Sequence, residues 1–345
     1  MSATSVRAGM RILGLLVCVL AALAACGGPQ GDVVLYCSLD RSHAEPVVAA
    51  FEKATGLKVE AYYDVEANKS VGLRRRLQEE ADRPQCDVFW NNEVVQMALL
   101  ARAGLLQPYD SPPAAGIPAQ HKDPGHLWTG FAARGRVLIV NTKNRPDPAS
   151  RPHGTADFLD PKNAGRCAMA APLTGTTAAH AGVWIAELGA EPALARFRAM
   201  QDNGVLFGPG NAHVMRLVRE GELDFGFTDT DDCQAAIDEG YPVAMVVPDQ
   251  GADEPGLILI PNTIGLVTGA PHPDAGKQLI DFVLGPAVEE QLARGASAQI
   301  PLRAEVPRPA KVLDVSACKL APVDWVAASA GYEAQQDALE ALFNR

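Results

Sequence analysis

Predicted strands alternate with helix-forming segments in the first part of this chain, and this alternation most limits the fold it can adopt. Val33–Cys37 is a short apolar run typical of a buried parallel strand, and Lys58–Tyr62 and Asp87–Trp90 are predicted as the next two strands. Helices are predicted between them, at Pro46–Phe51 and Gly72–Glu80. Strands that alternate with helices predict an α/β fold with a parallel sheet.

A second unit of the same kind follows later in the chain. Strands are predicted at Arg134–Asn141, Cys167–Ala170 and Phe225–Phe227, with a helix at Ala178–Leu188 and an extended segment at Leu257–Val267. Polar loops come directly after the strands of both units. Because ligands of α/β sheets bind beyond the carboxyl ends of the strands, the loops would face one another if two lobes met across a cleft.

The balance of charge is acidic and excludes one class of partner. The chain has 41 Asp and Glu against 30 Lys and Arg, a net charge of −11, and no basic stripe. A nucleic-acid ligand is therefore not expected. With 345 residues the chain is long enough for two lobes with cores of their own.

The N-terminus predicts export and attachment to a membrane. Two arginines precede the apolar stretch Ile12–Leu23, which is too short to span a bilayer comfortably. Small residues then lead to Cys26, as in a bacterial lipoprotein signal. We expect residues 1–25 to be a signal peptide, the sulfur of Cys26 to carry lipid on the periplasmic face of a membrane, and residues 26–31 to be a flexible tether. A plain signal peptide and an anchor helix remain as alternatives.

The cysteines downstream of Cys26 predict neither a zinc site nor a redox motif. No CxxC pair and no Cys/His cluster with zinc spacing is present. Most of these cysteines are expected to be small buried residues, and one disulfide with unassigned partners is possible. They are Cys37, Cys86, Cys167, Cys233 and Cys318.

Two polar segments are the main candidates for ligand binding. The first is Thr174, Gly175, Thr176 and Thr177, where a glycine and hydroxyls precede a helix whose free N–H groups favour anions. An ordinary helix cap and turn is the alternative. The second is Asp229–Asp232, with three carboxylates in four residues.

Charge repulsion makes the second segment the more informative one. Two unit charges at about 4 Å repel by about 1 kcal/mol in water and about 4 kcal/mol at an effective dielectric near 20. A partly enclosed cluster of Asp229, Asp231 and Asp232 therefore favours a bound cation or proton. Helix capping is the alternative, but it accounts for one carboxylate only.

Four further loop residues and one enzyme class complete the candidates. Ser38 and Asp40 follow the first strand, and Asn92 and Glu93 follow the third; each is also compatible with an ordinary polar turn. The segment Phe225–Asp231 resembles the DxD outline of haloacid-dehalogenase-type phosphatases. The residues after its second aspartate differ from that pattern, and the motif lies deep in the chain, so a phosphatase is a distant alternative.

Several longer stretches together resemble one branch of a known family. They are VVLYCSLD at 33–40, AEPVVAAFEKATGLKVE at 44–60, DVFWNNE at 87–93, RGRVLIVNT at 134–142, GELDFGFTDTDD at 221–232 and LILIPNTIGLVTGAPHPDAGKQLIDFVL at 257–284. In this order they resemble the ferric-iron-binding branch of the periplasmic solute-binding proteins that serve ABC importers.

The resemblance implies a fold, partners and no catalysis. It implies the two-lobed α/β periplasmic-binding-protein fold of type II, with residues 32–135 plus 263–345 in one lobe and 136–262 in the other. The lobes would be joined by strands that cross near 136–140 and 257–267. A monomer of this kind would close on its ligand and deliver it to a membrane permease that is driven by a separate ATPase.

The resemblance leaves two ligands open. Ferric binders of this branch carry two adjacent tyrosines where this chain has Asp231 and Asp232, whereas Thr174, Gly175, Thr176 and Asn211 match residues that hold a synergistic phosphate or carbonate. One hypothesis is Fe(III) bound by carboxylates and completed by such an anion. The other is a small organic amine or zwitterion, such as an aminophosphonate or polyamine, with its ammonium group on the aspartates. The metal ligands of the first hypothesis would be Asp40, Glu93, Asp231 and Asp232.

Overall fold

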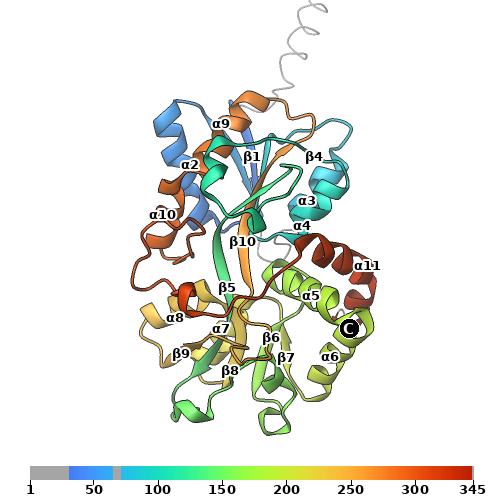
Figure 1. The fold of residues 1–345 in the computed structure, drawn as a ribbon, viewed down its shortest axis with the longest axis vertical. Helices are drawn as coiled ribbons and strands as arrows, with labels where there is room; N and C mark the ends of the chain where they lie inside the picture. Colours follow the sequence, from blue (N-terminus) through green and yellow to red (C-terminus); the bar gives the residue numbers. More distant parts are fainter. Residues whose placement is uncertain (1–30, 65–70, 344–345) are drawn as a thin grey trace, which may run out of the picture.

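A computed structural model describes residues 31–64 and 71–343, and it shows two α/β lobes stacked end to end (Figure 1). The sheet order is β2-β1-β3-β10-β5-β8-β6-β7, with β4 added to β10 and β9 added to β5. This arrangement confirms the predicted α/β fold. The predicted signal peptide, Cys26 and most of the tether lie outside the described residues.

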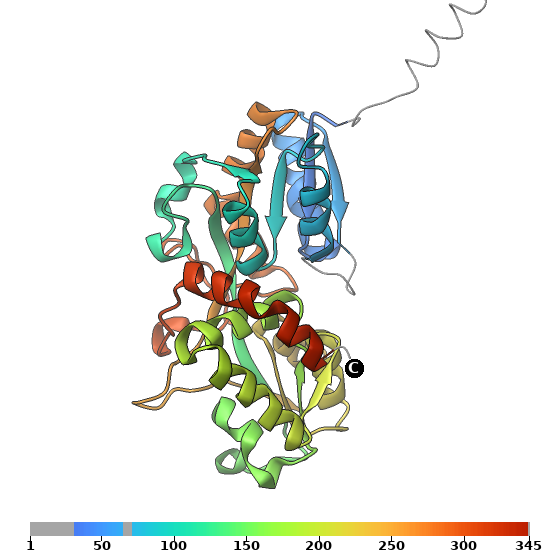
Figure 2. The same cartoon turned by 90° about the vertical axis from the view of Figure 1, so that its right-hand side faces the viewer.

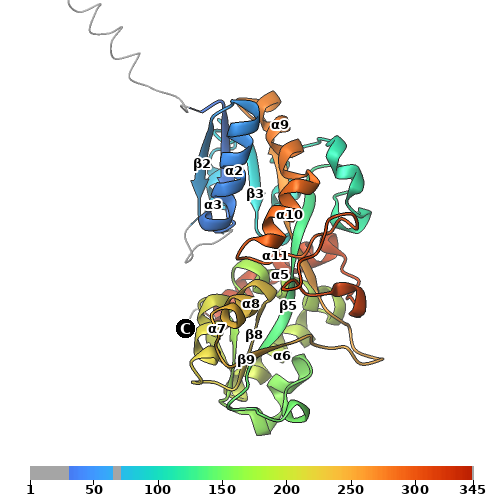
Figure 3. The same ribbon diagram turned by 90° about the vertical axis from the view of Figure 1, so that its left-hand side faces the viewer.

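The first lobe has a parallel core of three strands. β1 (Val33–Cys37) lies between β2 (Val59–Tyr63) and β3 (Val88–Asn91), and all five residues of β1 are buried. The apolar run that predicted β1 is buried because helices cover both sides of the sheet (Figure 3). These helices and the short edge strand are α2 (Arg41–Thr55), α3 (Val71–Glu79), α4 (Val95–Arg102), β4 (Leu106–Gln107), α9 (Pro273–Val283) and α10 (Pro286–Arg294).

Two long antiparallel strands join the lobes. β5 (Thr129–Asn141) pairs with β10 (Leu259–Val267) along its first half and with β8 (Phe225–Asp229) from Arg136 onward. All thirteen residues of β5 are buried. The strand therefore carries residues 134–136 from one lobe into the other at the level of the cleft.

The second lobe repeats the architecture of the first. β8 and β7 (Leu206–Gly208) flank β6 (Cys167–Ala170) in parallel, and β9 (Val243–Val246) runs antiparallel to β5. The carboxyl ends of β6 and β8 point toward the first lobe. The helices of this lobe are α5 (Gly175–Leu188), α6 (Ala190–Asp202), α7 (Asn211–Arg219) and α8 (Thr230–Asp238).

The C-terminal helix departs from the expected division of the chain. The sequence assigned residues 263–345 to the first lobe, but α11 (Trp325–Phe343) packs mainly on α5 of the second lobe and also touches α4 of the first (Figure 2). The reason is the apolar character of α5, which is buried from Thr176 to Ile185 and needs a cover on its outer side. Neither the order of the strands nor the periodicity of the sequence indicates which lobe this helix packs on.

The described residues give two further results. Within the described residues, Cys37, Cys86, Cys167, Cys233 and Cys318 form no disulfide, and all but Cys318 are buried, as expected of small core residues. Within residues 31–64 and 71–343, no helix has the length and apolar character needed to cross a bilayer.

Candidate functional site

A small polar cavity lies between the lobes, where the loops after the strands converge. It encloses about 90 Å³, far less than the several hundred Å³ typical of pockets for organic ligands. The first lobe contributes Asp40 and Asn92, and the crossing strand β5 contributes Arg134. The second lobe contributes the remaining residues of the lining: Ala170, Thr174, Gly175, Thr176, Thr177, Pro209, Gly210, Asn211, Ala212, Asp229, Asp231 and Asp232.

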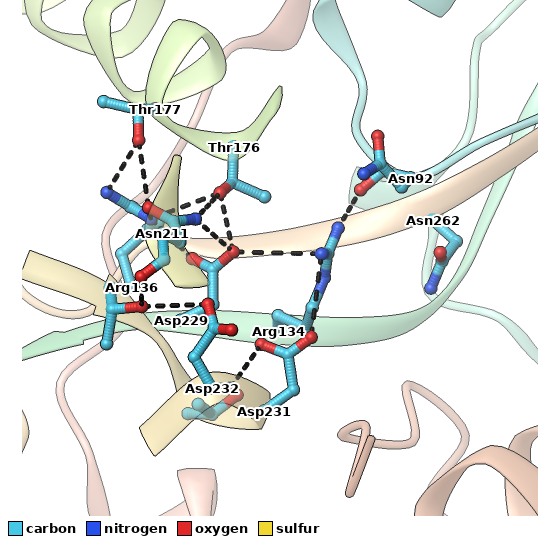
Figure 4. Close-up of polar contacts among 12 residues, drawn as sticks. Asn92, Arg134, Arg136, Thr176, Thr177, Asn211, Asp229, Asp231, Asp232 and Asn262 are labelled. Carbon is cyan, nitrogen blue, oxygen red and sulfur yellow. Dashed lines mark hydrogen bonds and ion pairs between the residues drawn. The ribbon is translucent and has the colours of Figure 1, made fainter. Parts of the chain in front are cut away.

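The second-lobe wall is built around the buried carboxylate of Asp229 (Figure 4). Arg136 Nη1 donates to Asp229 Oδ1 at 2.6 Å, while Thr176 Oγ1 and Asn211 Nδ2 donate to Asp229 Oδ2 at 2.6 and 3.0 Å. Burial by itself would raise the pKa of Asp229, but Arg136, Arg134 and the Thr176 hydroxyl together hold that pKa below its usual value. Asp229 is therefore a buried anion.

Asp231 and Asp232 stand in the first turn of α8, at the edge of the cavity. One oxygen from each of Asp229, Asp231 and Asp232 lies within 4.8 Å of the other two. Thr228 Oγ1 donates to Asp232 Oδ2 at 2.9 Å, and the Asp232 amide donates to Asp231 Oδ1 at 3.0 Å. Both side chains are only partly buried, and the helix N-terminus favours their negative charge.

Arg134 links the two walls of the cavity. Its guanidinium donates to the backbone carbonyl of Asn92 in the first lobe, and its Nη1 lies 3.8 Å from carboxylate oxygens of both Asp229 and Asp231 in the second. Burial alone would lower the pKa of Arg134, but the nearby aspartates, led by Asp231 and Asp229, outweigh it and raise that pKa. The guanidinium is thus a fixed positive charge beside the carboxylates.

The first-lobe candidates divide into two groups. Asp40 is exposed at the start of α2, and Asn92 is buried; both line the cavity. Ser38 and Glu93 are not among the described residues that line the cavity. Ser38 Oγ instead bonds Asn91 and the amide of Asn92, and it holds this loop in place.

The position of Glu93 differs from the one that a metal ligand requires. Its two carboxylate oxygens accept from the amides of Val95 and Gln96 and from Asn91 Nδ2, so Glu93 fixes the start of α4. The side chain is completely buried among these donors. Burial raises the pKa of Glu93 to about 7, although the three hydrogen bonds oppose this shift. In the structure, Glu93 therefore caps a helix and does not occupy the predicted position of a metal ligand.

Arg134 and Arg136 are two residues of the candidate site that the sequence pattern did not single out. Residues 134–141 were predicted only as a strand. The available signal was the position of two arginines at i and i+2 in an otherwise apolar strand, which puts both side chains on one face. Buried arginines need acidic partners, so this pattern could have directed attention to Asp229 and Asp231.

Comparison with known proteins gives the class of the chain. The family model for bacterial extracellular solute-binding proteins matches residues 47–318, and the chain belongs to that family. Its members bind solutes and are not enzymes.

Individual relatives carry two kinds of ligand in their names. The chain is 26% identical to the major ferric iron-binding protein of Neisseria meningitidis over 59% of its own length and 60% of that protein. It thus spans less than two thirds of that relative. It is 28% identical to a putative 2-aminoethylphosphonate-binding periplasmic protein of Salmonella typhimurium, over 77% of its own length and 76% of that protein.

The solved structures support the fold. The ferric binding protein of Campylobacter jejuni superimposes with a TM-score of 0.80 at 20% identity, over 90% of this chain and 98% of that one. At this identity the likeness concerns the two-lobed architecture and not the ligand. The periplasmic-binding-protein fold predicted from the resemblance is confirmed.

Proposed function

We propose that this chain is the periplasmic solute-binding component of an ABC importer and that its cargo is Fe(III). The ligands would be the carboxylates of Asp40, Asp231 and Asp232, with delivery to a membrane permease and its ATPase. Hard trivalent cations prefer such oxygen donors. The observation that carries the proposal is the group of Asp40, Asp231 and Asp232 in the lining of a cavity of about 90 Å³, where an oxygen of Asp231 and one of Asp232 lie within 4.8 Å of each other.

The distribution of charge supports a cationic cargo. Three carboxylates, from Asp40, Asp231 and Asp232, face one guanidinium, from Arg134, in the lining of the cavity. The remaining carboxylate, Asp229, is matched by Arg136. Because Asp40 comes from one lobe and the other two carboxylates from the opposite lobe, a cation between them would also hold the lobes together.

A small aminophosphonate is the second candidate, and Arg134 is the observation that favours it. Its guanidinium lies in the cavity next to the aspartates, so the site offers one partner for a phosphonate and several for an ammonium group. The Salmonella relative points the same way. The cavity of about 90 Å³ is small, so its size favours a compact cargo such as a metal ion over a larger organic solute.

Removal of the Asp231 and Asp232 carboxylates, which lie at the edge of the cavity, tests the site. The double variant Asp231→Asn, Asp232→Asn is expected to lose about 100-fold or more in affinity for Fe(III), because each charged contact contributes about 1.5–3 kcal/mol. Affinity is measured by isothermal titration with ferric citrate, and 2-aminoethylphosphonate is titrated in parallel. The matched control is Asp238→Asn, Glu239→Gln, which removes the same charge from the exposed end of α8.

Each outcome separates the candidates. Binding of iron that the double variant loses and the control keeps supports the ferric proposal. Binding of 2-aminoethylphosphonate alone replaces it with the second candidate. An unchanged iron affinity in the double variant would remove Asp231 and Asp232 from the site.

A further inference from the structure

The hydroxyl, amide and guanidinium donors at the N-terminus of α5 already hold an anion that belongs to the chain itself. Thr176 comes from α5, Asn211 from α7 and Arg136 from β5, and each donates to the Asp229 carboxylate. These are donors from three different elements that converge on one side chain. Figure 4 shows Asp229 in the middle of this group.

The donors are also bonded to one another, so the cluster is closed. Arg136 Nη1 donates to Thr176 Oγ1 and to Asn211 Oδ1 at 3.2 Å each, and Arg136 Nη2 donates to Thr177 Oγ1 at 3.2 Å. Thr177 Oγ1 in turn donates to Asn211 Oδ1 at 3.3 Å. A free anion that used these groups would have to displace a carboxylate that is 1% exposed and leave it buried without its partners.

Asp229 is also poorly placed to be a metal ligand itself. A carboxylate offers about four lone-pair positions. Its Oδ2 accepts two hydrogen bonds and has the Arg134 guanidinium at 3.8 Å, while its Oδ1 accepts from Arg136 at 2.6 Å. The lone pairs of Asp229 are largely taken, whereas Asp231 and Asp232 are partly exposed at the cavity edge.

We propose that Asp229 is a resident anion, and that the site captures its cation without phosphate, carbonate or any other added anion. The inference rests on the proposed function for the identity of the cation. It replaces the expectation that Thr174, Gly175, Thr176 and Asn211 hold a synergistic anion. Asp229 is on this view a positioning residue, because it organises the donors and balances Arg136 while the neighbouring aspartates bind the cation.

Deletion of the Asp229 side chain, followed by chemical rescue, tests the resident anion without any metal. Asp229→Gly leaves a carboxylate-sized space lined by Arg136, Thr176 and Asn211. The melting temperature of this variant is expected to be lower than that of the wild type and to rise in a saturable way with sodium formate, relative to sodium chloride at equal ionic strength. The wild type and the matched deletion Asp231→Gly are expected to show no formate-specific rise.

A second measurement covers the case in which Asp229→Gly does not fold. The affinity of the wild type for Fe(III), delivered as ferric citrate, is measured with and without sodium phosphate or bicarbonate. The expected change is less than about twofold once competition by the anion for iron in solution is subtracted. The melting temperature of the variant Asp229→Asn gives a further check. The amide of this variant fills the same space as the carboxylate, so formate is expected to have no effect on its melting temperature.

The outcomes for this inference and for the proposed function are distinct. An increase of roughly tenfold or more in wild-type iron affinity with phosphate or bicarbonate would overturn the resident anion and leave the ferric proposal intact. Failure of formate to act on a folded Asp229→Gly would also overturn it. If the wild type binds no Fe(III) at all, the ferric proposal fails, while the formate experiment still decides whether Asp229 fills the donor group.

Discussion

Single carboxylates in this protein have opposite roles according to what surrounds them. Asp229 is paired with arginine, so its pKa is lowered, whereas Glu93 accepts its hydrogen bonds from neutral donors in a fully buried place, and burial raises its pKa to about 7. Asp229 ends the buried strand β8, Glu93 follows the buried strand β3, and both are candidates for ligand binding. Burial and partners, and not the residue type, separate their roles.

Glu93 makes a testable contribution to the pH dependence of stability. Its pKa is about 7 in the folded chain against a usual value of 4.5, so between these values the folded state holds more protons than the unfolded state. The free energy of unfolding therefore falls as pH rises through this range, by up to about 1.4 kcal/mol per pH unit from this group. In Glu93→Gln this contribution is expected to be absent.

The measurement is urea denaturation of both proteins at a series of pH values. The stability of Glu93→Gln relative to the wild type is expected to increase from pH 4.5 to pH 7. His121 has a pKa lowered to about 4 by burial and acts with the opposite sign, but it is present in both proteins and cancels in the difference. Parallel curves for the two proteins would mean that Glu93 titrates as an ordinary carboxylate.

At the same scale, the sequence located the acidic cluster but not its counter-ions. Asp229, Asp231 and Asp232 are adjacent in the chain, so their repulsion and need for a cation are visible without a structure. Arg136 and Asp229 are 93 residues apart and meet because they are register partners across β5 and β8. A pairing of this kind depends on the topology of the sheet, which local patterns do not specify.

At the scale of elements, the apolar runs predicted the strands well, and the contact between α5 and α11 escaped prediction. Gly182 of α5 is the point of close approach, since a Cβ atom there would lie 2.7 Å from the Ala328 carbonyl oxygen of α11. A glycine inside a helix usually costs stability, so its presence here indicates that backbone contact requires it. Periodicity shows that α5 has a buried face, but not which segment covers it.

Gly182→Ala is expected to lower the free energy of unfolding by about 1–3 kcal/mol, because the added methyl group forces α11 away from α5. Urea denaturation measures the change. The control is Ala186→Ser, on the exposed side of the same helix, which should change stability by less than about 0.5 kcal/mol. If Gly182→Ala were as stable as the control, α11 could shift without loss of packing.

At the scale of the whole molecule, the cleft depends on contributions from both lobes and from the strands between them. Asp40 and Asn92 belong to the first lobe, Asp231 and Asp232 to the second, and Arg134 to the crossing strand. The site is therefore complete only when the lobes approach one another. The order of strands and loops predicted this meeting, whereas the size of the cavity required the structure.

Attachment of the whole molecule to a membrane is a prediction from the sequence alone. Cys26→Ser, expressed from the full-length sequence in a bacterial host, is expected to move the protein from the membrane fraction to the soluble periplasmic fraction, since it removes the site of lipid attachment. Cys18→Ser, which alters a cysteine inside the predicted signal peptide, serves as the control and should leave the protein with the membranes. Continued membrane association of Cys26→Ser would contradict lipidation at that residue.

The position of α11 also has a consequence for the order in which the molecule can be assembled. The second lobe is formed mainly by residues in the middle of the chain, yet its helix α5 is covered by residues 325–343. During synthesis, the ribosome must therefore pass residue 343 before that lobe has all of these parts. The first lobe likewise waits for α9 and α10, which follow the second lobe in the chain, and the second lobe exposes an apolar helix until residues 325–343 arrive.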